Sequence, residues 1–343
     1  MRAIATTVVR ESIRGKQRTG FIYDVDLEAR TVARRLPVPD PNFPESDDNP
    51  RGGVRGGRGV AVTSRGIVVA NYDTLSVYDD EWTLLDSITH PLFVGLHEID
   101  WDGSHIWMAA TGIDALLRTT LDGTVEAAWD PHAAPDFMQF DLRRRPDPLD
   151  GSVDYRVREA PLIDQCHLNG VTRRNGTTIV NCGLVRKRKS LAARTLRHLR
   201  RPPSRKEHQG SGRRNSGRSL VVQVDHGLPA RVLVELADHD FPTHNGQLLD
   251  DGRVIVNDST ENTLRVFAVE SPPKEILAAR VPGTWLRGLE PIAPNRVVVG
   301  TAPASLVIVD VTTGSLEGAV QLSDDPNEAV HGLTLCPPRD ERL

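Results

Sequence analysis

Four histidines stand at matching places in the sequence and are candidates for one shared site. Each opens a short run in which apolar residues alternate with others, as in His244-Asn-Gly-Gln-Leu. Imidazole is the commonest side-chain ligand of transition metals, and it is also the side chain that titrates nearest neutral pH. The set therefore indicates either a metal centre or general acid–base catalysis. The four are His97, His167, His244 and His331.

Two arginines occupy the same kind of position, because Arg58 and Arg287 open equivalent runs. A guanidinium group binds carboxylates and phosphates with parallel hydrogen bonds, so these residues predict a small, partly anionic organic substrate that they would orient. Two guanidinium groups beside a divalent metal ion would disfavour that ion unless an anion lies between them. The predicted ring therefore has six members, four histidines and two arginines.

Further polar residues are expected to support this ring. Metal-bound or catalytic imidazoles need acceptors that hold them in one tautomer, and carboxylates near the histidines could serve. The candidates for this supporting role are Glu98, Asp164 and Glu290. Asparagines at the ends of neighbouring apolar runs are expected to reach the same face and contact the substrate. These are Asn71, Asn181 and Asn257.

The runs that carry these residues belong to a repeat. A clear copy starts at His244, continues with Arg253-Val-Ile-Val-Asn and Thr263-Leu-Arg-Val-Phe, and ends with Glu275-Ile-Leu-Ala-Ala-Arg. Alternating runs rich in Val and Ile, bounded by Gly, Asp, Asn or Pro, are typical of strands. Four strands per unit, repeated about every 40 residues, predict the blades of a β-propeller.

The six key residues set the number of blades. The sixth unit begins at His331 and the sequence stops soon after it, so its other strands must come from the N-terminal residues 3–34. Such a shared blade would close the ring and remove exposed sheet edges. We therefore predict an all-β, six-bladed propeller forming a single domain over 1–343. A five- or seven-bladed ring and a β-sandwich are the alternatives.

Three insertions interrupt the repeat, at 37–57, 130–164 and 185–218. By their place within the units, all three are expected on the face that carries the histidines, where they would cover a pocket over the mouth of the tunnel. The segment 185–218 is strongly basic, with a possible short helix followed by a Gly/Ser/Arg-rich part. It is expected to be a solvated lid.

Composition and charge disfavour several classes of protein and indicate where this one is located. The net charge of −4 and the lack of a nucleic-acid-binding motif disfavour nucleic acid as a partner. No apolar stretch approaches the about 18 residues of a membrane helix, and the N-terminus lacks the apolar core of a signal peptide. Three cysteines without CxxC spacing indicate reduced thiols, so we expect a cytoplasmic protein. Arginine far outnumbers lysine, which is typical of GC-rich bacterial genomes, and we expect a monomer.

The segment Gln165-Cys-His-Leu-Asn-Gly resembles a family of uncharacterised bacterial propeller proteins with a Cys-His-Leu-Asn-Gly motif. The similarity extends to Leu96-His-Glu-Ile-Asp-Trp, Asp240-Phe-Pro-Thr-His-Asn-Gly and Pro282-Gly-Thr-Trp-Leu-Arg-Gly. This resemblance implies a propeller and no particular reaction. More distantly, the blades are similar to those of lactonase-like, strictosidine-synthase-like and streptogramin-lyase-like propellers. The four histidines resemble the iron centre of carotenoid oxygenases in ligand type only.

Three hypotheses follow. The first is a metalloenzyme of oxygenase or lyase type, with Fe(II) or another transition metal held by His97, His167, His244 and His331. The second is a metal-free hydrolase, lyase or isomerase in which one ring histidine is the general base. The third is a non-catalytic propeller that binds a ligand or a protein. The sequence has no GxSxG elbow, phosphate-binding loop or dinucleotide-binding motif, which disfavours those enzyme classes.

Overall fold

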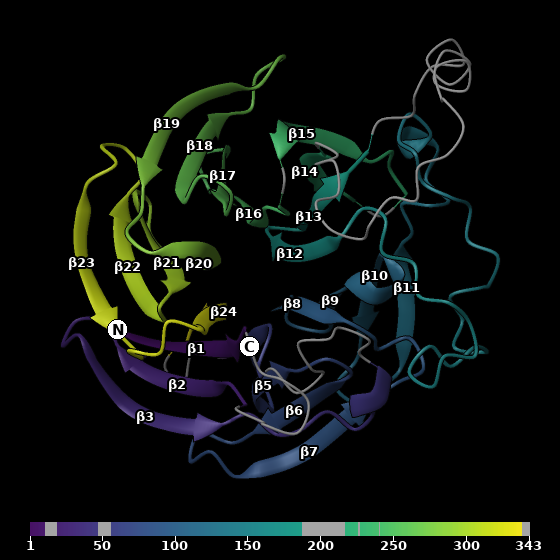
Figure 1. The fold of residues 1–343 in the computed structure, drawn as a ribbon, viewed down its shortest axis with the longest axis horizontal. Helices are drawn as coiled ribbons and strands as arrows, with labels where there is room; N and C mark the ends of the chain where they lie inside the picture. Colours follow the sequence, from purple (N-terminus) through teal and green to yellow (C-terminus); the bar gives the residue numbers. More distant parts are fainter. Residues whose placement is uncertain (11–18, 47–55, 187–216, 226, 240, 338–343) are drawn as a thin grey trace, which may run out of the picture.

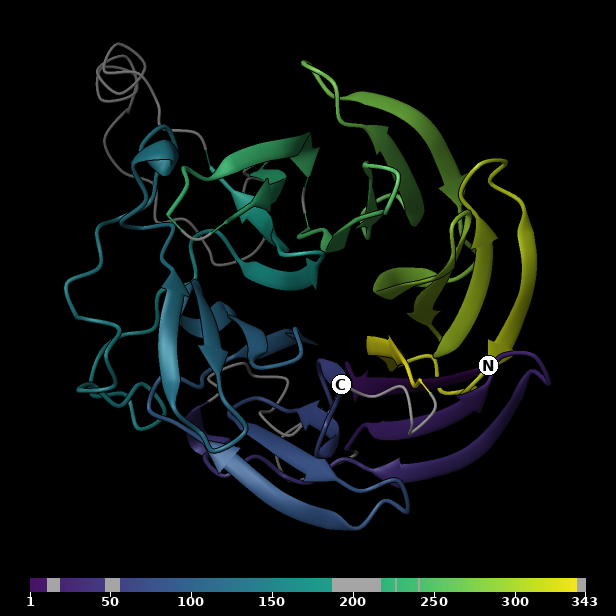
Figure 2. The same cartoon turned by 180° about the vertical axis from the view of Figure 1, so that it is seen from behind.

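The computed structural model describes residues 1–10, 19–46, 56–186, 217–225, 227–239 and 241–337. In these residues the strands form six four-stranded antiparallel sheets. The sheets stand around a central axis, and each turns one edge strand toward that axis (Figure 1). The same ring is seen from behind in Figure 2. The prediction of an all-β, six-bladed propeller is therefore confirmed.

The strands take the same four places in each blade. The innermost strands are β4 (Val60–Thr63), β8 (Leu96–Trp101), β12 (Leu168–Arg174), β16 (His244–Leu248), β20 (Thr284–Ala293) and β24 (Glu328–Leu335). The second strands are β5 (Gly66–Ala70), β9 (Ile106–Ala110), β13 (Thr177–Val185), β17 (Arg253–Asp258), β21 (Arg296–Ala302) and β1 (Arg2–Val9). Each second strand pairs with the innermost strand of its own blade.

The outer half of each blade follows the same order. The third strands are β6 (Thr74–Tyr78), β10 (Ala115–Thr119), β14 (Gly217–Gln223), β18 (Thr263–Ala268), β22 (Ser305–Asp310) and β2 (Phe21–Asp26). The outermost strands are β7 (Leu84–Thr89), β11 (Val125–Trp129), β15 (Arg231–His239), β19 (Lys274–Arg280), β23 (Leu316–Gln321) and β3 (Thr31–Pro37). Three short 3-10 turns complete the described elements: η1 (Pro44–Ser46), η2 (Thr111–Ile113) and η3 (Pro135–Phe137).

The two ends of the chain share the last blade, as predicted. Strand β24 pairs antiparallel with β1, and Ile4 lies opposite Thr334. Seven of the eight residues of β1 are buried, because β1 has a strand on either side of it. This pairing joins the first and last strands of the ring, so neither is left as an open edge.

The apolar core lies between neighbouring blades rather than on the axis. Leu75 of the first blade packs in one cluster with Leu96 and Met108 of the second. In the same way, Tyr23 of the last blade packs with Leu306 of the fifth. Blade faces turned toward each other bury their alternate apolar side chains, which leaves the axis free for polar ones.

Register breaks in the innermost strands lie at the ring residues. In five of these strands the pairing with the second strand shifts by a bulge at, or within a few residues of, a predicted ring residue. The shifts lie between Leu96 and Ile99, Leu168 and Gly170, His244 and Gln247, on both sides of Arg287, and opposite Ala5 and Thr7 in β24. Bulges change the direction in which a side chain points, and they often occur next to functional sites.

Two of the three insertions fall wholly or partly in the described residues. In 37–57, the backbone N–H groups of Asn42 and Phe43 bond to the carboxylate of Asp73, at 2.9 and 2.8 Å. In 130–164, Ile163 N–H bonds to the Gly112 carbonyl at 2.9 Å. Both contacts are made at turns between second and third strands, close to Arg58 and His97. The basic insertion 185–218 and its possible short helix lie almost entirely outside the described residues.

No helix in the described part of the chain is long and apolar enough to cross a membrane.

Candidate functional site

The structure brings the four histidines together. The ring centroid of His97 lies 5.5 Å from that of His167 and 5.2 Å from that of His331. The centroid of His244 lies 6.3 Å from that of His167. Positions separated by up to 234 residues in sequence thus share one cluster at the axis.

His97 is a buried, neutral member of this cluster. Its Nδ1 lies 3.0 Å from the Gly95 carbonyl and 2.8 Å from Thr111 Oγ1, whose hydroxyl donates to Leu168 O. Nδ1 must therefore donate, which leaves Nε2 as the acceptor, and Arg58 Nη1 lies 3.2 Å from both ring nitrogens. Burial, and then the charge of Arg58, hold the pKa of His97 well below its usual value.

His244 is also buried and neutral. Its Nδ1 lies 3.2 Å from Ser259 Oγ, and that hydroxyl donates to the Leu286 carbonyl at 2.7 Å. Nδ1 therefore donates, and Nε2 keeps a lone pair. Nε2 is buried and has no hydrogen-bond partner among the described residues. Burial and then the charge of Arg287 lower the pKa of His244 well below its usual value.

His331 is equally buried, with 2% of its surface exposed. Its Nδ1 lies 3.7 Å from Glu98 Oε1. Glu98 is therefore the predicted supporting carboxylate that lies nearest this histidine, at a distance beyond a hydrogen bond, and its supporting role stays a prediction. It also extends from the ring toward the interior of the tunnel.

His167 differs from the other histidines because part of its side chain, 23%, is exposed. Its Nδ1 lies 3.0 Å from Asp164 Oδ2. Since a carboxylate accepts, Nδ1 donates and Nε2 is the nitrogen with a free lone pair. A partly exposed imidazole oriented by a carboxylate is the usual arrangement of a general base.

Asp114 positions His167, and the sequence analysis missed it. His167 has a left-handed backbone, with φ of 50°. Around it, the fully buried carboxylate of Asp114 accepts hydrogen bonds from the N–H groups of Gln165, Cys166 and Leu168. Asp114 lies more than 50 residues earlier, in the turn after η2, and no sequence motif links the two positions.

The three asparagines predicted to contact the substrate are buried and bond to backbone groups; they are Asn71, Asn181 and Asn257. The side-chain oxygen Oδ1 of Asn71 accepts from the N–H of Thr74 at 2.9 Å. The amide of Asn181 donates to Thr243 O at 2.9 Å, and that of Asn257 to Gly288 O at 3.2 Å. The structure therefore gives each of them a part in fixing the loops around the ring, and their contact with substrate stays a prediction.

A small cavity of about 80 Å³ lies on the axis, lined by residues of all six innermost strands. Glu98, Asp100 and Glu290 face it, and Arg174 Nη2 lies 3.4 Å from Glu290 Oε1. Burial raises the pKa of Glu98 and that of Glu290 to about 8, and that of Asp100 to about 6. Glu290, predicted to support a histidine, thus belongs to the tunnel interior together with Arg174.

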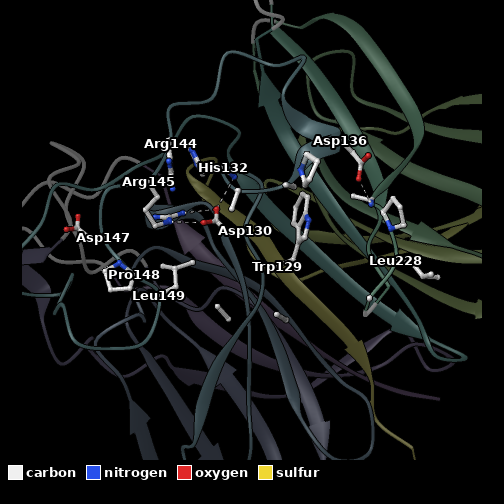
Figure 3. Close-up of a pocket in the computed structure, with 18 residues that line it drawn as sticks. Trp129, Asp130, His132, Asp136, Arg144, Arg145, Asp147, Pro148, Leu149 and Leu228 are labelled. Atoms are coloured by element: carbon white, nitrogen blue, oxygen red, sulfur yellow. Dashed lines mark hydrogen bonds and ion pairs between the residues drawn. The ribbon is translucent and has the colours of Figure 1, made fainter.

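A second, larger pocket has a volume of about 810 Å³. Figure 3 shows the side chains that line it. Trp129 and Leu149 line it from β11 and the 130–164 insertion, and Leu228 lines it from the turn before β15. Arg145 reaches Asp130 across its floor, with Nε 3.2 Å from Oδ2. None of the six ring residues lines this pocket, so the chemistry predicted from the sequence is not located there.

The donor groups of the ring are not arranged as a metal site. Among the described residues, no three His, Cys, Asp or Glu side chains are grouped so that they could hold a metal ion. The acceptor nitrogen of His97 faces a guanidinium group at 3.2 Å. A four-histidine Fe(II) centre would therefore need these side chains to move toward a common point, and it stays a proposal.

Comparisons with known proteins identify the fold. No protein-family model matches this sequence, and no curated protein is detectably similar to it. A chain from a nidogen–laminin complex superposes with a TM-score of 0.58 at 9% identity, over 97% of both chains. A candidate gluconolactonase superposes with 0.53 at 11% identity over 80% of both. The periplasmic gluconolactonase of Pseudomonas aeruginosa superposes with 0.50 at 14% identity, over 98% of this chain and all of that one.

This protein shares the propeller fold with these structures, but a shared fold does not show a shared reaction. At these identities the similarity concerns the fold alone, and it includes both a chain from a nidogen–laminin complex and gluconolactonases. The similarity to the Cys-His-Leu-Asn-Gly family stays a prediction. The similarity to lactonase-like propellers agrees with these neighbours at the level of the fold.

Proposed function

We propose that this protein is an enzyme that acts on a small, partly anionic organic molecule at the mouth of the tunnel, with His167 as the general base. One observation carries the proposal. Of the six ring residues, all of which the structure describes, only His167 and Arg287 are not buried. The ring thus offers solvent one imidazole oriented by a carboxylate and one guanidinium group.

The roles of the ring residues follow from their surroundings. Asp164 holds the Nδ1 proton of His167, so Nε2 is ready to accept a proton from water or substrate. Arg287 would bind a carboxylate or developing oxyanion. His97 and His244 are neutral and buried, so they neither attract nor repel a substrate anion. Binding of the anion is therefore assigned to Arg287.

The reaction we favour is hydrolysis of a lactone or ester that carries an anionic group, because the propellers similar in fold include gluconolactonases. His167 Nε2 would take a proton from water as the water oxygen bonds to the carbonyl carbon. When the ring carbon–oxygen bond breaks, the imidazolium would return that proton to the leaving alkoxide. The product would be the open hydroxy acid, and the histidine would be regenerated.

The test is turnover of a panel of lactones and esters with and without a carboxylate. We expect hydrolysis that survives exhaustive chelation and falls at least about a hundredfold in His167→Gln. His105→Gln, in an outer turn between β8 and β9, is the matched control and should keep wild-type activity. Equal turnover by His167→Gln and wild type would contradict the proposal, and absence of turnover with specific binding would favour the non-catalytic hypothesis.

The Fe(II) centre predicted from the sequence stays a second proposal. It is supported by the clustering of the four imidazoles and by His244 Nε2, which is buried, has no hydrogen-bond partner among the described residues and lies on a ring next to that of His167. Elemental analysis of protein purified without a chelating tag tests it. Stoichiometric iron, or another transition metal, would support it. Substoichiometric metal that is not restored by anaerobic addition of Fe(II) would contradict it.

A further inference from the structure

An aromatic pair lies beside the accessible arginine of the ring. Trp285 precedes Arg287 in β20, and Phe241 precedes His244 in the loop before β16. The ring centroids of Phe241 and Trp285 are 5.5 Å apart, with an angle of 59° between their planes. The Arg287 guanidinium carbon lies 5.8 Å from the centroid of the Trp285 ring. The guanidinium of Arg287 and two aromatic rings thus lie together, and a second guanidinium, that of Arg10, also contacts the indole.

Phe241 presents much of this surface to solvent, since 50% of it is exposed. A phenyl ring gains most from burial, and an exposed one next to a binding residue is a natural contact for an apolar group. The aromatic pair and Arg287 together match a molecule with an anionic end and an apolar body.

The backbone of Trp285 holds the pair in place at some cost. Its φ of 57° lies in the left-handed region, which is unfavourable for a bulky residue. The side-chain oxygen of Asn262 accepts from Trp285 N–H at 3.0 Å and fixes this conformation. The guanidinium of Arg10 lies over the indole, 3.6 Å from its centroid, and covers one face. Strained backbone of this kind is concentrated at binding sites.

We propose that Phe241 and Trp285 form an apolar subsite beside Arg287 and select an aromatic carboxylic acid or its derivative. The carboxylate would bind Arg287, and the aromatic body would pack on the exposed ring of Phe241. Arg10 leaves Phe241, rather than Trp285, as the main contact surface. This inference rests on the proposed function only for the position of the site, because it concerns binding and not turnover.

Equilibrium binding to the full-length protein tests the inference. Calorimetric titrations with phenylacetate, cyclohexylacetate and acetate compare an aromatic, an aliphatic and a minimal carboxylate. We expect phenylacetate to bind about tenfold more tightly than cyclohexylacetate, and acetate to bind most weakly, because aromatic pairs add stabilisation beyond buried area. Equal affinity for phenylacetate and cyclohexylacetate would overturn the choice of an aromatic substrate.

Variants separate the two parts of the subsite. Phe241→Leu keeps an apolar side chain and should lose the preference for phenylacetate over cyclohexylacetate. Phe241→Ala should weaken phenylacetate about tenfold and leave acetate unchanged. Arg287→Gln should weaken all three acids. Leu85→Ala, at an equally exposed apolar residue (50%) of β7, is the matched control and should bind like wild type.

The outcomes distinguish this inference from the proposed function. His167→Gln should still bind phenylacetate if the subsite exists, whether or not His167 is the base. Tight aromatic binding without any turnover would keep the subsite and overturn the proposed enzyme. Unchanged phenylacetate affinity in Phe241→Ala would overturn the subsite, even if lactone hydrolysis depends on His167.

Discussion

The carboxylate of Asp114 accepts a hydrogen bond from the backbone N–H of Cys166, with 2.9 Å between the two heavy atoms. Burial raises the pKa of Asp114, but the hydrogen bonds from His132, Gln165 and Cys166 outweigh it and hold this pKa below the usual 3.8. A buried carboxylate from the second blade thus fixes the loop that carries His167 of the third.

Replacing this carboxylate should therefore disturb both stability and activity. In Asp114→Asn, an amide NH₂ would face backbone donors, so we expect a loss of about 2–4 kcal/mol in unfolding free energy. Displacement of His167 should lower kcat more than it raises KM. Chemical denaturation and steady-state kinetics check this, with the exposed Asp324→Asn as control.

The stabilisation by Asp114 should also depend on acid pH. Because its folded-state pKa is lowered, its contribution is present above the unfolded value of about 3.8 and is lost as pH falls through the folded value. The stability gap between wild type and Asp114→Asn should therefore shrink in acid. A gap that stays constant with pH would argue against an ionised carboxylate in this role.

The Asp164 carboxylate should affect catalysis only by orienting His167. Asp164→Asn removes the charge that holds Nδ1–H, and the amide can also present its NH₂ to Nδ1, so the tautomer is no longer enforced. We expect kcat to fall by about ten- to a hundredfold with little change in KM or in melting temperature, since Asp164 is half exposed. If the same change has no effect in a His167→Gln background, the two residues act as one unit.

Glu98 should make the protein less stable as pH rises. Burial raises its pKa from the usual 4.5 to about 8, despite the hydrogen bond from Asn245 and the charge of Arg287. Between these two values the folded state binds more protons than the unfolded state, so the unfolding free energy falls with rising pH. Glu98→Gln removes this penalty, so its stability relative to wild type should improve across this range.

The gain should reach a few kcal/mol above pH 8, since each pKa unit corresponds to about 1.4 kcal/mol. Urea denaturation at a series of pH values measures it. The exposed Glu270→Gln should show no such pH-dependent gain. A parallel course of Glu98→Gln and wild type over the whole range would show that Glu98 is ionised in the folded protein.

Any side chain at Gly332 should destabilise the protein, because the backbone is closely packed there. A Cβ added there would clash with the carbonyl oxygen of Arg58 and lie 2.9 Å from Gly59 Cα. Gly332→Ala must therefore push the innermost strands of the first and last blades apart, and we expect a loss of about 2–4 kcal/mol. Gly252→Ala, where a Cβ meets nothing within 4 Å but φ is +83°, should lose only about 1 kcal/mol.

The three thiols should be unreactive in the folded protein. Cys166 and Cys182 are fully buried and Cys336 is 8% exposed. Burial raises the pKa of Cys166 well above its usual 9, so the reactive thiolate is suppressed. We expect an aromatic disulfide reagent to label none of them rapidly in buffer and all three in denaturant. Rapid native labelling of Cys166 would show that the loop before His167 opens.

Much of the architecture was predictable because a propeller repeats one local pattern. Period-2 apolar runs indicated the strands, and the incomplete unit after His331 required the N-terminal strands to close the ring. The same repeat placed His97 and His244 at equivalent points, so their convergence followed from the fold. The supporting carboxylate of His167 was also predictable, since Asp164 lies only three residues away.

What the sequence by itself determined is therefore the strand pattern, the closure of the ring and the residue types at its mouth. What only the tertiary structure decided is which of them can act. Accessibility at the axis depends on how six distant segments pack, and it buries His97, His244 and His331 while leaving His167 and Arg287 open. A long-range contact such as that between Asp114 and Cys166 cannot be read from the sequence, because it gives rise to no repeat or motif near either residue.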